Sequence, residues 1–361
     1  MSGAEILAYL EALVGCDTQN PPRAIDGDHP VFDCCRKGLP AGFEARTWDH
    51  GDGHVTWFAV RGRPRVLFNV HLDTVPAGDG WNSDPHRLEV VNGRVHGRGA
   101  CDIKGAAAAL LALAERGAPN LALLFTTDEE GADGCCVRNF LASGEGQRFE
   151  QVVVAEPTGC QAVLAHRGFL SVKTRFRGVT GHSSQARALR DNANHQLARW
   201  AARALEVAAA RKTAPEDPGT CFNLGLVQGG TKSNVIAGSA FVHWSARLPP
   251  GASNQAFLEE MQACVHDGDA VNWELPFQGE PLPAAGCDNG AARAFCARRE
   301  LRVGAPVDFW TEAALFSAAG LPALVLGPGD IEQAHAADEW VSLRQLEQAF
   351  ELYGRIVSED G

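Results

Sequence analysis

The 361-residue sequence predicts an α/β protein with a mixed, mainly parallel central sheet and an inserted ferredoxin-like unit. Two observations support this fold class. Apolar strand segments alternate with helical segments in the first part of the chain, and the middle part follows the order β-α-β-β-α-β. The chain also exceeds the roughly 100–200 residues of a typical single domain. We therefore expect two structural units.

The first part of the chain alternates short apolar strands with helices. The expected strands are residues 55–60, 66–70, 121–126 and 152–155, and the expected helix is the alanine-rich stretch 103–116. At the N-terminus, an amphipathic pattern favours a helix rather than a signal peptide. The longest apolar run, 106–114, is shorter than the ~20 residues that span a bilayer.

The middle of the chain changes rhythm after His166. Its expected elements are a strand at 170–177, a helix at 192–211, strands at 222–227 and 235–247, a helix at 254–265 and a strand at 270–275. The chain then returns to helical segments and a buried strand at 322–326. We therefore expect one domain formed by residues 1–167 and 277–361, interrupted by an inserted domain at 168–276.

Composition limits the classes of partner. The 32 basic and 44 acidic residues give a net charge of −12, which disfavours binding to nucleic acid or to anionic membranes. A small-molecule partner is favoured. The eleven cysteines are an odd number without a C-x-x-C motif, which indicates neither a disulfide framework nor a cysteine zinc site. Reduced thiols predict a cytoplasmic protein.

The strand at 66–70 runs into His71 and Asp73, which the alternation of an extended chain places on the same side. Open α/β sheets bind ligands at the carboxyl ends of their strands. His71 is therefore a candidate metal ligand, and Asp73 is a carboxylate that could support its orientation. The alternative is an ordinary polar loop after a strand.

Further acids follow the next strands. Asp102 lies in the glycine-flanked stretch 97–105, and taken alone it is better explained as the N-cap of the following helix. Glu129 and Glu130 follow Asp128 at the end of the strand at 121–126. Three consecutive acids repel one another, and either a bound cation or solvent can offset this repulsion.

Two more candidates complete a set that one strand edge would bring together. Glu156 follows the strand at 152–155, and His335 follows the turn at 327–329. Histidines and carboxylates without cysteine suit Zn, Co or Mn. Two metals about 3.5–4 Å apart would need a bridging carboxylate and two terminal ligands each, and the set supplies these with one acid to spare. The motifs of serine hydrolases, HExxH zinc proteases, P-loop enzymes and dinucleotide-binding folds are missing.

Five motifs occur in a fixed order: H-L-D-T-V, G-R-G-A-C-D-I-K-G, T-D-E-E-G, A-E-P-T and Q-A-H-A-A-D-E. Together they resemble the dinuclear-zinc family of aminoacylases, carboxypeptidase G, succinyl-diaminopimelate desuccinylase and acetylornithine deacetylase. The resemblance covers essentially the whole chain. It implies a zinc-peptidase-like catalytic domain, with the inserted domain acting as lid and dimerisation domain.

The resemblance also implies roles for the candidate residues. Two divalent metals, zinc or alternatively cobalt, would be bound by one set of His71, Asp102 and Glu156 and a second set of Glu130, Asp102 and His335. Asp102 would bridge the two metals, and Asp73 would orient His71. Glu129, the spare acid, resembles the family's general base, which takes a proton from the attacking water and passes it to the leaving amine.

Three residues of the inserted domain match substrate positions of the family. By the resemblance, His182 would stabilise the developing oxyanion from the partner subunit of a homodimer, and Asn234 and Arg247 would bind substrate. Arg247 would hold an α-carboxylate through its two-pronged guanidinium. The alternatives are a loop histidine and a solvated strand-end arginine. The sequence departs from the family pattern directly after His182.

Within the family, residues 20–23, 309–313 and 327–335 look most like acetylornithine deacetylase. We therefore expect hydrolysis of an N-acetyl amino acid of the ornithine or citrulline type to acetate and the free amino acid, in arginine biosynthesis. Succinyl-diaminopimelate desuccinylation or dipeptide hydrolysis on the same centre is an alternative. An inactive metal-binding regulatory protein is another, but such a protein would have no use for Glu129 beside Glu130.

Overall fold

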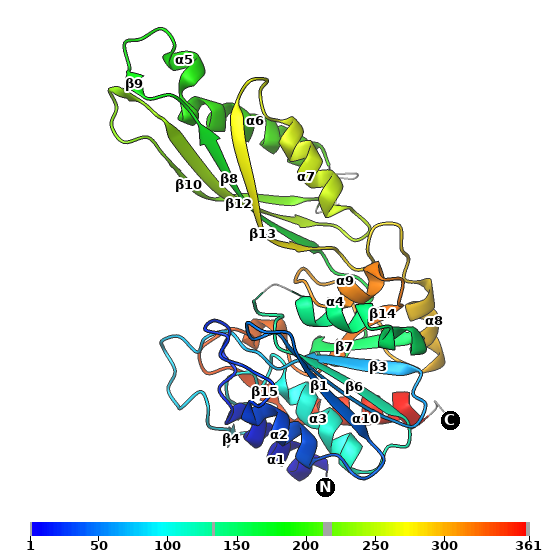
Figure 1. The fold of residues 1–361 in the computed structure, drawn as a ribbon. Helices are drawn as coiled ribbons and strands as arrows, with labels where there is room; N and C mark the ends of the chain where they lie inside the picture. The colour runs from blue at the N-terminus through cyan, green and yellow to red at the C-terminus, as the bar shows by residue number, and fades with distance from the viewer. Residues whose placement is uncertain (1, 132–133, 212–218, 359–361) are drawn as a thin grey trace. The chain divides into compact units, whose positions relative to one another are not determined.

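The computed structural model describes residues 2–131, 134–211 and 219–358, and the chain divides into two compact units (Figure 1). The first unit comprises Met1–Ala165, Asp288–Pro306 and Thr311–Gly361. The second comprises His166–Cys287 and Val307–Trp310, so it is inserted into the first along the chain. Within the described ranges, no helix is long and apolar enough to cross a membrane.

A six-stranded sheet forms the centre of the first unit. Its strands, in spatial order, are β1 (Glu44–Asp49), β2 (Val55–Arg61), β6 (Leu121–Thr126), β3 (Val66–His71), β7 (Gln151–Pro157) and β14 (Ala323–Gly327). The last four run parallel to one another, whereas β1 and β2 are antiparallel additions at one side. The sheet is mixed and mainly parallel, as predicted. The carboxyl ends of its four parallel strands therefore share one edge.

Helices cover both faces of this sheet (Figure 1). On one face α1 (Ser2–Val14), α3 (Lys104–Glu115) and α10 (Leu343–Ser358) pack on one another, and α3 contacts β3 and β7. On the other face α4 (Cys135–Ala142) and α9 (Ala313–Ala318) contact each other, and they contact β2, β7 and β14. The remaining helices of this unit are α2 (Pro30–Lys37) and α8 (Gly290–Arg298).

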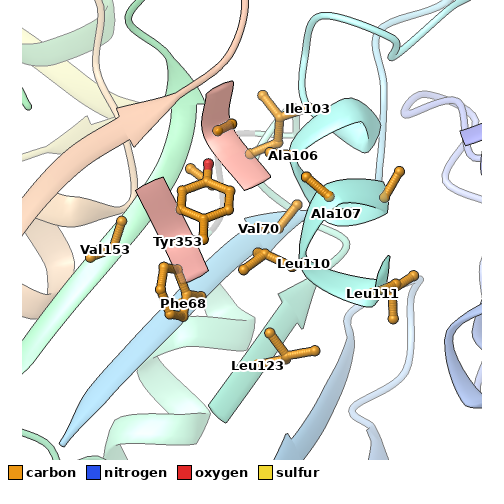
Figure 2. Packing of buried hydrophobic residues seen from close by; sticks show 14 of the residues in the cluster. Phe68, Val70, Ile103, Ala106, Ala107, Leu110, Leu111, Leu123, Val153 and Tyr353 are labelled. Atoms are coloured by element: carbon orange, nitrogen blue, oxygen red, sulfur yellow. The ribbon is translucent and has the colours of Figure 1, made fainter. Parts of the chain in front are cut away.

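The core fixes the strand that carries His71. Leu110 of α3, Phe68 of β3 and Tyr353 of α10 lie together in Figure 2, and all three are fully buried. The rings of Phe68 and Tyr353 have centroids 5.2 Å apart, and the Tyr353 hydroxyl donates a hydrogen bond to the Leu326 carbonyl at 2.9 Å. Alanines at most other positions of α3 let it approach β3 closely, because their side chains are small.

A small antiparallel sheet lies beside this core. It consists of β4 (Glu89–Val91), β5 (Arg94–His96) and β15 (Trp340–Ser342), with β5 in the middle. Trp340 pairs with His96 in the register of β15 and β5. This pairing places the residue before β15, Glu339, next to the loop that follows β5.

The second unit is an antiparallel sheet with two long helices. The sheet has the order β10 (Cys221–Gly229), β12 (Ser239–Leu248), β8 (Gly168–Arg177) and β13 (Ala270–Gly279). Its helices α6 (Ala193–Ala210) and α7 (Asn254–Ala263) complete the predicted ferredoxin-like order. The core contains Trp200 of α6, Trp244 of β12 and Phe257 of α7, and the indole N–H of Trp200 donates to the Met261 carbonyl at 2.9 Å.

One predicted strand of this unit is wrong as a single element. Residues 235–247 form two strands: β11 (Val235–Ile236), which pairs with β9 (Gly181–His182), and β12. Between them the chain turns, because the Ala237 carbonyl accepts from the Ala193 amide at 2.9 Å and the Gly238 carbonyl accepts from the Gly178 amide at 3.0 Å. Ala237 is buried in the core, so this turn is part of the packing rather than a loop.

Candidate metal centre

His71 is the last residue of β3, and its side chain is buried. Its Nδ1 lies 2.9 Å from the main-chain oxygen of Asp73, a contact in which the imidazole nitrogen must donate. Nε2 is then free to act as an electron-pair donor, the role of a metal-ligating histidine. This atom lies 3.1 Å from Asp102 Oδ1 and 3.5 Å from Glu156 Oε1. Three of the predicted ligands therefore come together from β3, the loop before α3 and the end of β7.

Asp73 supports this arrangement mainly through its neighbours. Its Oδ1 is 3.6 Å from His71 Nδ1, so the hydrogen bond that orients the imidazole comes from the Asp73 main chain rather than the carboxylate. Oδ2 accepts hydrogen bonds from Asn20 Nδ2 at 2.9 Å and from the Glu130 amide at 3.0 Å. Asp73 thus adds negative charge beside His71 and fixes the main chain of Glu130.

Asp102 is not a helix cap, which was the simplest interpretation of its sequence position. Helix α3 begins at Lys104, the capping position is Ile103, and no side chain caps this helix. The peptide bond between Asp102 and Ile103 is cis. The Asp102 side chain is buried and faces the histidines instead.

A buried glutamate holds the loop that carries Asp102. Glu339 Oε1 accepts from the amides of Cys101 and Asp102 at 2.8 and 3.0 Å, and Oε2 accepts from the Gly99 amide at 3.0 Å. Arg98 Nη1 donates to the same Oε2 at 2.7 Å. Four donors therefore converge on one carboxylate, which fixes the backbone of the loop without using the side chain of Asp102.

The two oxygens of Asp102 face two histidines, each of which lies beside a further glutamate. Oδ1 faces His71 and, beyond it, Glu156, while Oδ2 lies 3.1 Å from His335 Nε2, which is itself 3.0 Å from Glu130 Oε1. Two ligands of one tetrahedral zinc ion, with bonds of about 2.0–2.1 Å, lie about 3.3–3.4 Å apart. The observed spacings are close to this value on both sides. The residues present therefore fit two ions that share Asp102.

The acids and imidazoles of this cluster shift one another's pKa values. Hydrogen bonds to Asp102 and Glu130 raise the pKa of His335 to about 10. Burial opposes ionisation of Asp102, but hydrogen bonds from His335 and His71 outweigh it and hold the pKa of Asp102 well below its usual range. Burial raises the pKa of Glu156. Metal binding at this cluster must therefore displace protons from the histidines.

The cluster is open on one side. The His335 side chain is 53% exposed, whereas that of His71 is 1% exposed. The exposed side of the cluster is therefore at His335, whereas the side chains of His71 and Glu156 are buried.

Glu129 lies in the turn after β6, directly before Glu130, and is partly buried. Desolvation raises its pKa well above the usual value, and the charges of Glu156, Glu130 and Asp102 add to the shift. Neither histidine–carboxylate pair uses this residue. A carboxylate with a raised pKa next to a metal cluster is suited to accept a proton from water.

The third acid of the sequence run, Asp128, points elsewhere. Its Oδ2 lies 3.0 Å from both His54 Nδ1 and the Cys136 amide. The donor atoms of His54, Asp128 and Cys136 lie within 4.8 Å of one another, which could hold an ion. However, Arg23 Nη1 lies 3.1 Å from His54 Nε2, and burial raises the pKa of the Cys136 thiol far above the usual value. We interpret this group as a structural hydrogen-bond chain.

In the second unit, His182 ends β9 and Asn234 directly precedes β11, the strand that pairs with β9 to form a ribbon. The Ser183 amide donates to the Asn234 carbonyl at 3.1 Å, and His182 Nδ1 lies 2.8 Å from the Ser184 hydroxyl. Both residues are exposed. His182 Nε2 therefore remains available on the surface of this unit.

Arg247 lies near the far end of β12 from this ribbon. Its guanidinium is 3.7 Å from the ring centroid of Phe169. The β9–β11 ribbon adjoins the start of β12 at Ser239, and eight residues of extended chain separate Ser239 from Arg247, which is about 26 Å at 3.3 Å per residue. The structure therefore does not bring Arg247 of one chain together with His182 and Asn234 of the same chain.

Sequence reasoning missed two buried groups near the centre. Glu339 stands in the stretch Q-A-H-A-A-D-E, which signalled His335, but nothing in the sequence indicates which amides it binds. Glu312 is also fully buried and accepts from Thr126 Oγ1 at 2.9 Å. Burial and the charge of Asp128 raise the pKa of Glu312 to about 8. Residues 309–313 carry part of the resemblance to the family, but nothing in the sequence assigns a role to Glu312 itself.

Replacing Glu339 with Ala should destabilise the protein by about 3–5 kcal/mol, because Arg98 and three amides would lose a buried partner. Denaturant unfolding of the chelator-treated protein measures this change. Glu351→Ala on the exposed face of α10 is the matched control and should stay within about 0.5 kcal/mol. Equal stabilities of the two variants would contradict the role assigned to Glu339.

Comparisons with known proteins agree with this geometry. A sequence model of Peptidase family M20/M25/M40 matches residues 67–359. The chain is 46% identical over 362 residues to N-acetyl-L-citrulline deacetylase from Xanthomonas campestris pv. campestris, a match that covers 98% of each protein. It is 29% identical over 311 residues to acetylornithine deacetylase from Proteus mirabilis, covering 81% of this chain and 78% of that protein.

A solved structure shares the fold over nearly the whole chain. The crystal structure of aminopeptidase PepT from Bacillus cereus superimposes with a TM-score of 0.76 at 19% sequence identity, covering 99% of this chain and 98% of that one. At this identity the likeness shows the fold alone. The extent of the sequence match and the identity to the Xanthomonas protein show that the chain belongs to peptidase family M20/M25/M40.

Proposed function

We propose that this protein is a metal-dependent deacetylase that hydrolyses the amide bond of N-acetyl-L-citrulline, giving acetate and citrulline in arginine biosynthesis. One observation carries the proposal: Asp102 presents its two oxygens to two histidines, each beside a further glutamate. The substrate follows from the 46% identity to N-acetyl-L-citrulline deacetylase over 98% of the chain. N2-acetyl-L-ornithine is the related substrate named by the more distant relatives.

The ligand assignment follows the distances within the cluster. His71, Asp102 and Glu156 would hold one ion, and Glu130, Asp102 and His335 the other. Nitrogen and oxygen donors without thiolate suit zinc, with cobalt as the alternative. Bound divalent ions supply Lewis acidity at the amide carbonyl and lower the pKa of water.

Glu129 is the proton carrier in this proposal. It would take a proton from the attacking water and deliver it to the amine nitrogen as the C–N bond breaks. The ionised carboxylate can accept the first proton, and the resulting carboxylic acid can protonate the leaving amine. Asp73 keeps this turn in place through the Glu130 amide.

Substrate recognition falls to the inserted unit. Arg247 would bind the α-carboxylate of the acyl amino acid, and Asn234 and His182 would bind the amide and its developing oxyanion. About 26 Å of β12 separates the start of this strand from Arg247, too far for one small substrate to reach both groups. We therefore propose a homodimer in which His182 and Asn234 of one subunit complete the site of the other.

In this scheme residues 1–167 and 277–361 form the catalytic domain, and residues 168–276 form the lid and dimerisation domain. The protein would act in the cytoplasm, where the thiols of its free cysteines stay reduced. The negative net charge is compatible with a small-molecule substrate, since no large basic surface is needed.

A substrate panel tests the proposal. The metal-loaded protein is assayed against N-acetyl-L-citrulline, N2-acetyl-L-ornithine, N-acetyl-L-methionine and N-succinyl-diaminopimelate, and kcat/KM is compared, because this ratio measures discrimination in the transition state. We expect the highest value for N-acetyl-L-citrulline. A higher value for the succinyl substrate, or no hydrolysis of any acetyl amino acid, would overturn the proposal.

A further inference from the structure

Two cysteines from different helical segments meet at the surface of the first unit. Cys16 follows the end of α1, and Cys34 lies within α2. Their sulfur atoms are 3.9 Å apart, and both side chains are partly exposed. Each thiol also donates a hydrogen bond to the Ala12 carbonyl oxygen of α1, with sulfur–oxygen distances of 3.4 Å for Cys16 and 3.7 Å for Cys34. Both sulfurs therefore lie beside one carbonyl oxygen of α1, next to each other.

The surroundings make the two thiols unequal. The hydrogen bond between the two thiols lowers the pKa of Cys34 to about 7, with Lys37 adding to the shift. The same hydrogen bond, together with burial, raises the pKa of Cys16. A thiolate beside a protonated thiol is the arrangement of an attacking cysteine and a resolving cysteine in redox-sensitive proteins.

Cys16 also lies at the start of a segment that reaches the metal centre. Its carbonyl accepts from Lys104 Nζ at 3.0 Å, two residues beyond Asp102. Two residues further on, Thr18 Oγ1 donates to the Leu72 carbonyl at 2.6 Å, and the Thr18 carbonyl accepts from the Thr74 amide at 3.0 Å.

The same segment then contacts a carboxylate of the centre directly, since Asn20 Nδ2 donates to Asp73 Oδ2 at 2.9 Å. Residues 16–20 thus connect the cysteine pair to the residues that follow His71 and to the start of α3, two residues after Asp102. A displacement at Cys16 would be passed along this hydrogen-bonded segment to Asp73 and to the loop of Asp102.

We propose that Cys16 and Cys34 form a reversible dithiol–disulfide site that reacts with peroxide and lowers the activity of the neighbouring metal centre. The thiol chemistry stands independently of the proposed deacetylase function, while the activity effect rests on it. A disulfide needs sulfurs about 2.05 Å apart, so the pair must close by more than an ångström from its present separation.

We infer that the Cys16 side moves on closure. Val31, Phe32 and Cys35 anchor α2 in the core, whereas Cys16 sits in the turn after α1. We therefore expect the 16–20 segment to shift while α2 stays in place.

The reaction is balanced with hydrogen peroxide as the oxidant. The Cys34 thiolate attacks one peroxide oxygen, forming an S–O bond and breaking the O–O bond, and the leaving hydroxide takes a proton to become water. The Cys16 sulfur then attacks the Cys34 sulfur, the S–O bond breaks, and the leaving hydroxide takes the Cys16 thiol proton to give a second water. Two thiols are oxidised by two electrons, and one peroxide is reduced. A dithiol reductant reverses the change.

Peptide mapping of the metal-loaded protein tests the chemistry without an activity assay. After treatment with hydrogen peroxide and alkylation, we expect a cross-linked pair of peptides carrying Cys16 and Cys34, which dithiothreitol returns to separate alkylated peptides. Cys34→Ser should abolish this pair, and Cys221→Ser, which changes an exposed cysteine of the second unit, should leave it intact. Recovery of Cys16 and Cys34 only as separate peptides from the wild-type protein would overturn the proposal.

Activity tests the coupling to the metal centre. Hydrolysis of N-acetyl-L-citrulline should fall several-fold in the oxidised wild-type protein, recover with dithiothreitol and stay constant in peroxide-treated Cys34→Ser. A disulfide that forms without any loss of activity would overturn the coupling. If the reduced protein hydrolyses no acetyl amino acid, the proposed function fails, and the peptide map still decides whether the cysteine pair is a redox site.

Discussion

Changing Glu129 to Gln is expected to lower kcat by about 10²–10⁴-fold while the protein keeps its full metal content. The amide preserves the shape of the side chain but cannot accept a proton from water. Neither histidine–carboxylate pair includes Glu129, so the ligand set formed around Asp102 is untouched by the substitution. The loss should therefore appear in turnover and not in metal affinity.

The pH dependence gives a second, independent readout of Glu129. A general base works only when ionised, and desolvation together with the charges of Glu156, Glu130 and Asp102 raises the pKa of Glu129. The rate of the wild-type enzyme should therefore fall as the pH decreases through the pKa of this group. In Glu129→Gln this acidic limb should disappear from the residual activity.

Metal analysis and steady-state kinetics measure the outcome. Glu332→Gln is the matched control, since it makes the same chemical change at an exposed site three residues before His335. It should keep both the metal content and the rate. Wild-type turnover in Glu129→Gln would remove this residue from the mechanism, and loss of metal would place it among the ligands instead.

The strand ends of the first unit could be predicted because buried strands leave a clear signal. The strands at Val66–His71 and Leu121–Thr126 are mostly apolar and are buried along their whole length, as expected for parallel strands covered on both faces. Once such strands are assigned, the polar residues after them must gather at one edge. His71 and Glu156 lie in contact for this reason.

The support of the centre could not be predicted, because its partners are main-chain groups. Glu339 accepts from three main-chain amides between Gly99 and Asp102. Nearly every residue has such an amide, so the sequence does not show which ones a carboxylate will bind. The sequence likewise does not show where the side chain of Asp128 points. Three consecutive acids suggest one cluster, yet Asp128 turns to His54, 74 residues earlier in the chain.

The inserted unit shows a different limit of sequence reasoning. The apolar pattern of residues 235–247 continues across the turn at Gly238, because Ala237 stays buried while the chain changes direction. Periodicity therefore predicted one strand where there are two. This strand pairing also sets the distance between His182 and Arg247 along the sheet. No sequence motif indicates that distance.

Replacing Asp102 with Ala is expected to abolish binding of both metals and, with them, activity. Substitution of residues that only support a metal ligand typically weakens binding by about 10–100-fold, so loss of a carboxylate shared by two sites should weaken it by more than about 100-fold at each. Each remaining half would contain one histidine and one glutamate, namely His71 with Glu156 and His335 with Glu130. Two ligands are too few for a stable zinc site.

The fold should survive this change, and that separates Asp102 from Glu339. The loop is held through the Asp102 amide, which Ala retains, so chelator-treated Asp102→Ala should lose only the hydrogen bonds to His71 and His335 and should be destabilised less than Glu339→Ala. Chelator-treated Glu339→Ala should instead show a large loss of unfolding stability, which does not depend on metal binding. Calorimetric titration with zinc and denaturant unfolding, applied to both variants, distinguish a ligand from its support. If Asp102→Ala still bound two equivalents of zinc tightly, the two ions could not share this carboxylate, and the arrangement of the whole centre would have to be reassigned.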